Sequence, residues 1–128
     1  MVSSKPAALP KDFLRSCLLL LLREEPAHGY ELVERTPTLG VGSQDPGGLY
    51  RALRKLEQDG MVRSAWERSE SGPHRRIYQI TRAGGEELHR RSLELAAGAE
   101  AIETFIARYQ EFVAMRRGTR PLEPARRR

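Results

Sequence analysis

The sequence has little of what secreted domains and membrane proteins rely on. Its 128 residues contain 1 cysteine, Cys17, so the chain forms no internal disulfide and no site with several thiolate ligands, which fits a reducing compartment. The longest apolar run, residues 17–22, is far shorter than the roughly 20 residues that cross a bilayer. No small-residue cleavage site follows it. We therefore expect a cytoplasmic protein that is neither secreted nor inserted in a membrane.

Patterns for catalysis and metal binding are also missing. His28, His74 and His89 lie in three separate segments with no cysteine or carboxylate at metal-ligand spacing, which argues against a zinc site. The glycines of residues 40–48 lack the preceding strand and the spacing of a phosphate-binding loop. Cys17 falls on the apolar face of an expected helix, which does not suit a reactive thiolate. We predict a protein that is not an enzyme and has no cofactor or metal.

Positive charge, by contrast, is in excess, and it is concentrated in two segments. The chain has a net charge of +5. Residues 46–82 hold eight basic and four acidic side chains, a net +4, and residues 116–128 hold six and one, a net +5. The remaining segments are net negative. A polyanionic partner is therefore expected to meet the middle of the chain, and a further contact at the tail is left open.

The spacing of apolar residues predicts two helices before residue 37. In residues 13–23 the apolar side chains follow steps of three and four, the stripe of an amphipathic helix, and Pro26 closes the segment. A second, short helix is expected from Gly29 onward. It ends before Pro37, because proline disfavours the helical conformation of the residue that precedes it.

A third helix, residues 46–59, is the most informative segment. Asp45 is expected to cap it, Pro46 suits its first position, and Gly60 is expected to end it in the left-handed conformation. One face is apolar and packs on a core, with Leu49, Ala52, Leu53 and Leu56. The opposite face gathers Gly47, Tyr50, Arg51, Arg54 and Gln58, with Lys55 on its flank.

Two segments of β-branched and aromatic character follow, residues 61–67 and 75–81, and the turn between them predicts a hairpin. The polar tip carries His74, Arg75 and Arg76, which suit a phosphate backbone. Side chains alternate along a strand, so the two arginines are expected to face opposite sides, and only one of them need meet a partner. Trp66 is expected in the core of the hairpin, with a platform for ligand stacking as the alternative.

Thr81 is expected to cap a long helix over residues 83–115. Its apolar residues keep a heptad register. Such a stripe is longer than a domain of ~70 residues can cover, so a helix from a second copy is the simplest partner. We predict a homodimer, to which the first helix contributes Leu14 and Leu18 and the long helix contributes Leu88, Leu95, Ala99, Ile102, Ile106, Tyr109 and Val113.

Three helices followed by a two-stranded hairpin, with a basic outward face on the third helix, describe a winged helix-turn-helix. The predicted fold is mainly α with a small β-hairpin and a long C-terminal dimerisation helix. The expected organisation is a flexible arm (1–8), a DNA-binding domain (9–82), the dimerisation helix (83–115) and a disordered basic tail (116–128).

Short motifs sharpen this prediction. They are Gly29-Tyr30-Glu31-Leu32, Leu49-Tyr50-Arg51-Ala52-Leu53, Gly60-Met61-Val62, and, across the hairpin, Trp66, Gly72-Pro73, Arg75-Arg76, Tyr78 and Thr81 through Gly84. The pattern closely resembles the PadR family of bacterial transcriptional regulators, in its shorter branch with a single C-terminal helix. The resemblance is specific over residues 28–84 and rests on the helical pattern alone over residues 13–24 and 85–115.

The resemblance implies a dimeric repressor of inverted-repeat operators in double-stranded DNA, with the third helix in the major groove and the wing tip on the flanking backbone. It also implies release by a small-molecule effector, whose identity the motifs do not give. Gly48 stands where many members have serine or threonine, so affinity is expected to rely more on the wing. The expected DNA-binding residues are Ser43, Gly47, Gly48, Tyr50, Arg51, Arg54, Lys55, His74, Arg75 and Arg76.

Three alternatives stay open. Tyr50 packs against the hairpin instead of touching DNA, or the basic face around Arg51 and Arg54 is an ordinary solvated surface. In the third, the module is a protein-interaction domain that docks an acidic partner. Neutralising Arg51 and Arg54 together discriminates between DNA binding and docking, because a docking module has no DNA binding to lose.

Overall fold

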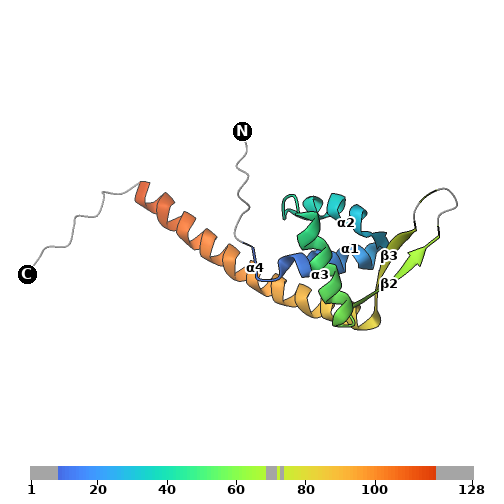
Figure 1. Cartoon of the computed structure of the whole chain (residues 1–128). Coiled ribbons are helices and arrows are strands. Elements are labelled where there is room, and N and C mark those ends of the chain that lie inside the picture. Colours follow the sequence, from blue (N-terminus) through green and yellow to red (C-terminus); the bar gives the residue numbers. More distant parts are fainter. Residues whose placement is uncertain (1–8, 69–71, 73, 118–128) are drawn as a thin grey trace, which may run out of the picture. The chain divides into compact units, whose positions relative to one another are not determined.

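The computed structural model describes residues 9–68, 72 and 74–117. The chain divides into two compact units, Met1–Leu93 and Glu94–Arg128. The expected N-terminal arm, most of the hairpin turn and the tail from residue 118 lie outside the described residues. The first unit holds the three short helices, a sheet and the beginning of the last helix (Figure 1).

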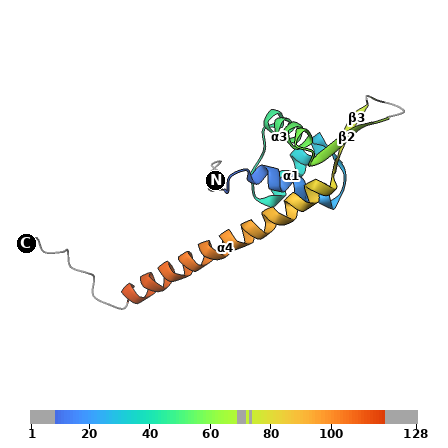
Figure 2. The same ribbon diagram turned by 90° about the horizontal axis from the view of Figure 1, so that it is seen from below.

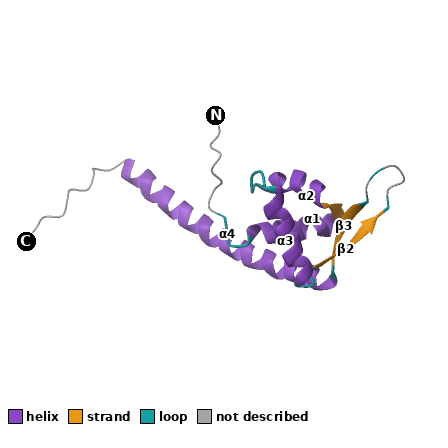
Figure 3. Ribbon diagram, in the orientation of Figure 1, coloured by secondary structure: helices purple, strands orange, loops and turns teal. Residues whose placement is uncertain are grey.

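The described elements confirm a mainly helical fold with a small sheet (Figure 3). The helices end within a few residues of their expected limits, although the last one reaches Arg117 and so takes in the first two residues of the expected tail. In chain order the elements are α1 (Phe13–Glu24), β1 (Ala27–His28), α2 (Gly29–Arg35), a 3-10 turn η1 (Thr36–Leu39), α3 (Pro46–Gln58), β2 (Val62–Glu67), β3 (Arg75–Ile80) and α4 (Arg82–Arg117).

The expected helix caps are present. Asp45 Oδ2 accepts a hydrogen bond from the backbone N–H of Gly48 at 2.9 Å and so caps α3. Gly60, just past α3, has a φ of 79°, the left-handed conformation that glycine adopts without strain. Thr81 Oγ1 accepts from the N–H of Gly84 at 3.1 Å at the start of α4. These three positions mark the two ends of α3 and the start of α4.

The sheet has three antiparallel strands in the order β1-β3-β2, where the sequence predicted a hairpin of two. Ala27 pairs with Tyr78 and His28 with Ile77, so β1 adds a short edge to the hairpin. Beyond that edge, β2 and β3 continue as a two-stranded ribbon that extends past the helices (Figure 2). The wing is therefore anchored at its base to the segment that leads into α2.

Leucines from α1, α2 and α3 form the core of the first unit, together with Ala27, Val62 and Tyr78 from the three strands. Leu18 is 0 % exposed and packs entirely inside this core. The expectation that Leu18 lies at a dimer contact is therefore wrong, because its surface is already covered by its own chain. Leu14 and Leu88 are half-buried against the same core.

Candidate nucleic-acid interface

The exposed face of α3 is the centre of the candidate interface. We call Gly47, Tyr50, Arg51, Arg54 and Lys55 the recognition face; all five are exposed, whereas Leu49, Leu53 and Leu56 on the other side are fully buried. Arg51 keeps 73 % of its side chain exposed and lies 3.9 Å from the capping carboxylate of Asp45. Ser43 is exposed just before the helix, and Gly48 is half-buried.

Arg54 is available for a partner. It makes no hydrogen bond or ion pair with any other residue that the structure describes. Burial raises the pKa of the nearby Tyr78, and the charge of Arg54 opposes this shift. The guanidinium of Arg54 therefore keeps its donors for an acceptor outside the chain.

Tyr50 packs against the beginning of α2. Its ring and hydroxyl lie so close to Gly29 that a Cβ added there would overlap the ring. Tyr50 nevertheless keeps 41 % of its surface exposed. The ring is thus supported on one side by the glycine of the Gly29-Tyr30-Glu31-Leu32 motif and presents its other side to solvent.

The two wing arginines lie on opposite faces of the hairpin, as strand alternation predicts. Arg75 Nη1 donates to Tyr30 Oη at 2.9 Å, and its guanidinium lies 5.6 Å from the centre of the Tyr30 ring. Arg76 Nε donates to Ser64 Oγ at 2.7 Å, and its guanidinium lies 5.4 Å from the centre of the Trp66 ring. Each wing arginine is held by an aromatic ring on its own face, and His74 beside them is exposed.

Trp66 does not fill the core of the wing, so that expectation is wrong. Its side chain is 65 % exposed, and Tyr78, two strand positions closer to the helices, is the aromatic residue that is buried. The part of the hairpin that carries Trp66 therefore has no core to cover an indole.

His28 ties the wing to α2, a role that the sequence did not indicate. Its Nδ1 lies 2.8 Å from Glu31 Oε1, and its Nε2 lies 2.9 Å from Glu67 Oε1 at the end of β2. The backbone N–H of His28 also donates to Glu31 at 2.8 Å and lowers the pKa of that carboxyl. Glu31 was visible in the sequence as part of a motif, but Glu67, the other carboxylate that His28 contacts, is distant along the chain.

No metal site is found in the described part of the chain. No three histidine, cysteine or acidic side chains among those residues come together as a metal site would require. Cys17 is buried, and burial raises the pKa of its thiol. None of the described helices is both long and apolar enough to span a bilayer.

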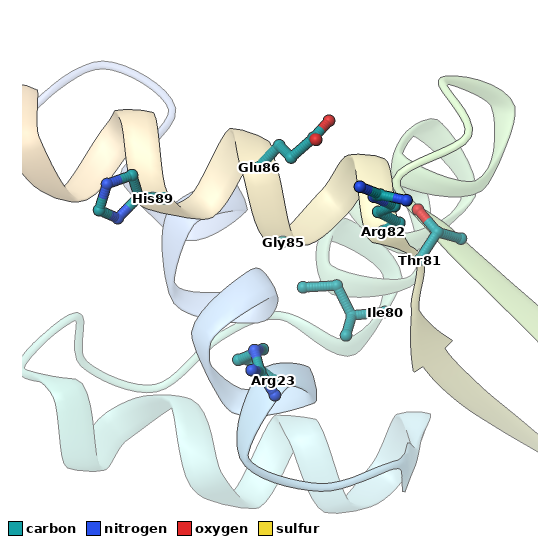
Figure 4. A pocket seen from close by; sticks show the side chains of 7 residues that line it. All are labelled: Arg23, Ile80, Thr81, Arg82, Gly85, Glu86 and His89. Carbon is teal, nitrogen blue, oxygen red and sulfur yellow. The ribbon is translucent and has the colours of Figure 1, made fainter.

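A pocket of about 600 Å³ lies where the end of α1 approaches the end of β3 and the first turns of α4 (Figure 4). Charged and polar side chains dominate its lining, which comprises Arg23, Ile80, Thr81, Arg82, Gly85, Glu86 and His89. All of these belong to the first unit.

The second unit presents apolar side chains along α4. Of the expected dimer residues, Ile102, Ile106 and Tyr109 are exposed hydrophobics, Ala99 is exposed, and Leu95 and Val113 are half-buried. Phe105 and Phe112, which the heptad assignment left out, are 72 % and 53 % exposed. At about 100° per residue they lie beside Ile102 and Tyr109, so the apolar face is broader than a single seam.

Helices α1 to α3, followed by a hairpin that projects beyond them, define a winged helix-turn-helix protein. The model of the PadR-like family of transcriptional regulators matches residues 18–90, which is more than half of the chain. The chain therefore belongs to this family, as the motifs predicted. No curated protein sequence matches the chain.

Solved structures agree with this assignment. A conserved protein of unknown function, described as a potential transcriptional factor, is 32 % identical, with 86 % of this chain and 98 % of that one covered and a TM-score of 0.73. A transcriptional regulator of Thermoplasma acidophilum is 26 % identical, with 74 % and 91 % covered and a TM-score of 0.66. PadR of Bacillus subtilis, solved in complex with operator DNA, is 24 % identical, with 61 % and 45 % covered and a TM-score of 0.55.

Proposed function

We propose that this chain is a cytoplasmic, sequence-specific DNA-binding repressor that acts as a homodimer on inverted-repeat operators. The observation that carries the proposal is the recognition face of α3, where Arg51 and Arg54 stand exposed on the side opposite to buried leucines. A guanidinium placed in the major groove donates two hydrogen bonds to guanine O6 and N7. We assign sequence discrimination to these two arginines.

The remaining residues of the expected interface suit contacts to the backbone. Tyr50, supported by Gly29, offers a hydroxyl at the edge of the recognition face. Lys55 adds positive charge on the exposed face of α3. The further members of the set are Ser43, Gly47, Gly48, His74, Arg75 and Arg76, of which Arg75 and Arg76 retain guanidinium donors beyond those that their aromatic partners and Ser64 occupy.

Dimerisation is assigned to α4. Exposed Ile102, Ile106 and Tyr109 lie on one side of the helix, with Phe105 and Phe112 beside them. Large contiguous apolar faces of this kind mark interaction sites. A twofold dimer presents two copies of α3 with the same symmetry, so the matched DNA is an inverted repeat with half-sites about one helical turn apart or a multiple of that.

Effector control is assigned to the pocket at the start of α4. Arg23, Arg82 and His89 supply hydrogen-bond donors there, and Glu86 supplies an acceptor (Figure 4). This lining suits a small polar molecule that carries an acidic group. The pocket lies between the end of β3 and the first turns of α4, the helix assigned to dimerisation. Binding of the effector there would therefore change the distance between the two wings of the dimer.

Selection of bound fragments from random duplex DNA by the purified protein tests the proposal. We expect an inverted repeat to be recovered, and we expect the Arg51→Ala, Arg54→Ala double variant to lose binding to it while remaining folded. Recovery of no preferred sequence would contradict the proposal. In that case, an interaction with an acidic protein that the double variant loses would favour the docking module.

A further inference from the structure

Trp66 is the only tryptophan of the chain and one of its most exposed apolar side chains. It lies directly opposite Arg76 in the register of the hairpin. Aromatic residues that remain exposed are enriched where a protein meets a partner, because they combine a large apolar area with a polar group. The indole has the area, and its Nε1–H is a donor.

The arginine beside Trp66 is fixed in place by α3. Glu57, near the end of α3, accepts hydrogen bonds from the backbone N–H and the hydroxyl of Ser64 at 3.1 and 2.7 Å. Ser64 Oγ in turn accepts from Arg76 Nε at 2.7 Å. The two terminal nitrogens of Arg76 have no acceptor among the residues that the structure describes. This chain of bonds positions one wing arginine relative to the recognition helix and leaves its outer donors available.

Trp66 and Arg76 lie on the face of the hairpin that α3 occupies. Val62, Ser64 and Trp66 alternate onto one face of β2, and Tyr78 and Arg76 lie opposite Ser64 and Trp66 on β3. At the base this face is the buried one, because Val62 and Tyr78 belong to the core. Trp66 and Arg76 therefore lie on the side of the wing that adjoins α3, farther from its base than the buried residues.

The surroundings of Trp66 are cationic. A hollow of about 470 Å³ beside it is lined by Trp66, Arg68 and His74. The acidic residue nearest in the strand, Glu67, points to the other face and is bonded to His28. The carboxylate of Glu57 lies on the same face and accepts two hydrogen bonds from Ser64. An indole flanked by arginines suits the sugar-phosphate backbone of a nucleic acid.

We infer that Trp66 and Arg76 form a second DNA contact, in which the indole lies against a deoxyribose and the guanidinium of Arg76 bonds an adjoining phosphate. The inference rests on the proposed function, because α3 must hold the duplex that this pair touches. A cation binds the phosphate, whereas the neutral ring buries the C–H groups of the sugar. The two contributions differ in their dependence on salt.

Because Trp66 is the sole tryptophan, its intrinsic emission reports the contact directly. Native protein is titrated with an unlabelled mixed-sequence duplex of about 30 base pairs, roughly three helical turns. The anisotropy of a labelled copy of the duplex reports binding independently. We expect the emission of Trp66 to change with the same midpoint as the anisotropy. In the absence of DNA, the emission should not change on dilution of the protein.

Variants separate the two contributions. Trp66→Ala should weaken binding roughly fivefold to tenfold with little change in the salt dependence, and Trp66→Phe should recover part of the loss. Arg76→Ala should reduce the slope of log K against log salt by about 0.9, the value for one phosphate. Arg63→Ala is the matched control, because it removes the same charge near the base of the hairpin, where Arg63 bonds Gln79, and should leave the slope unchanged. Trp66 is exposed, so its variants should unfold at the temperature of the native protein.

Two results would overturn the inference while leaving the proposed function standing. One is duplex binding by anisotropy with unchanged Trp66 emission and native affinity in Trp66→Ala. The other is emission that changes on dilution without DNA, which would place Trp66 at a contact between copies of the chain. Failure of the native protein to bind any duplex would overturn both.

Discussion

Arg15 of α1 bonds both carboxylate oxygens of Glu87 in α4. Its Nε lies 2.6 Å from Glu87 Oε2, and its Nη2 lies 3.0 Å from Oε1. The remaining nitrogen, Nη1, lies 2.8 Å from Asp59 Oδ2 at the C-terminal end of α3. Arg91 also donates to Glu87 and reaches Ser16 in α1. One buried carboxylate thus connects the first helix and the start of the last, and Arg15 extends the connection to α3.

This arrangement makes part of the stability depend on pH. The hydrogen bond from Arg15 lowers the pKa of Glu87 from 4.5 to about 2. A folded-state pKa below the unfolded value adds stability that is present above about pH 4.5 and is lost as the pH falls toward 2. Glu87→Gln should therefore cost roughly 2 to 3 kcal/mol at neutral pH. Urea unfolding measures this loss of stability. The difference in unfolding free energy between Glu87→Gln and the native protein should shrink near pH 3. A difference that stays constant with pH would show that the ion pair is not its source.

Gly29 is expected to hold the ring of Tyr50 in its position. A Cβ there would overlap the ring, so Gly29→Ala should displace the half-exposed Tyr50 from the recognition face at a cost of about 1 kcal/mol. Gly85→Ala is the control, because a Cβ at Gly85 meets nothing and alanine favours a helix. Chemical unfolding of both variants gives the comparison. Equal stabilities would mean that the contact with Tyr50 is not constrained.

The helices were predictable because each carries its own signal. The caps at Asp45, Gly60 and Thr81 and the apolar face of α3 are encoded within a few neighbouring residues. The strand β1 was not predictable, since Ala27–His28 is too short to show an alternation and forms only because β3 lies beside it. Tertiary pairing of this kind has no local signature.

In the candidate site, too, features encoded by local spacing were predictable and features that depend on distant contacts were not. The recognition face was predicted residue by residue from helical spacing, and its members are exposed where expected. The environments of Leu18 and Trp66 were mistaken for one reason. An apolar side chain in a periodic segment fits a core and an exposed contact equally well, and only the packing of distant elements decides which. The bonds of His28 to Glu67 and of Glu57 to Ser64 join separate segments and were likewise invisible.

Dimerisation should depend on one side of α4. Ile102→Glu places a charge in the apolar face and should give a monomer, because burying an unpaired carboxylate is costly. Leu93→Glu is the matched control. Leu93 is equally exposed, at 60 %, but lies on the opposite side of the helix at about 100° per residue. Analytical ultracentrifugation should show a dimer for the native protein and the control. A dimeric Ile102→Glu protein at micromolar concentration would contradict the assignment.

Gly48 offers a gain rather than a loss. A Cβ there meets only ordinary contacts, with Asp45 Oδ2 at 3.5 Å, so serine fits without rearrangement. The added hydroxyl would stand at the exposed start of α3, where it can donate to a phosphate. Gly48→Ser should tighten DNA binding slightly without changing the preferred sequence. A changed ranking of sequence variants would instead mean that position 48 faces base edges.

The central claim is that α3 reads the sequence while the wing supplies general affinity. Arg54→Ala and Arg75→Ala remove the same group from the two elements. We expect Arg54→Ala to relax preference at one symmetric pair of operator positions, by about 1 to 3 kcal/mol. Arg75→Ala should instead weaken binding to operator and random DNA about equally.

Binding isotherms for the native protein and these two variants, on the selected operator and on each of its single-base variants, provide the most direct test. The account predicts that Arg54→Ala changes the ranking of the base variants and Arg75→Ala preserves it. It is contradicted if Arg75→Ala changes the ranking and Arg54→Ala does not.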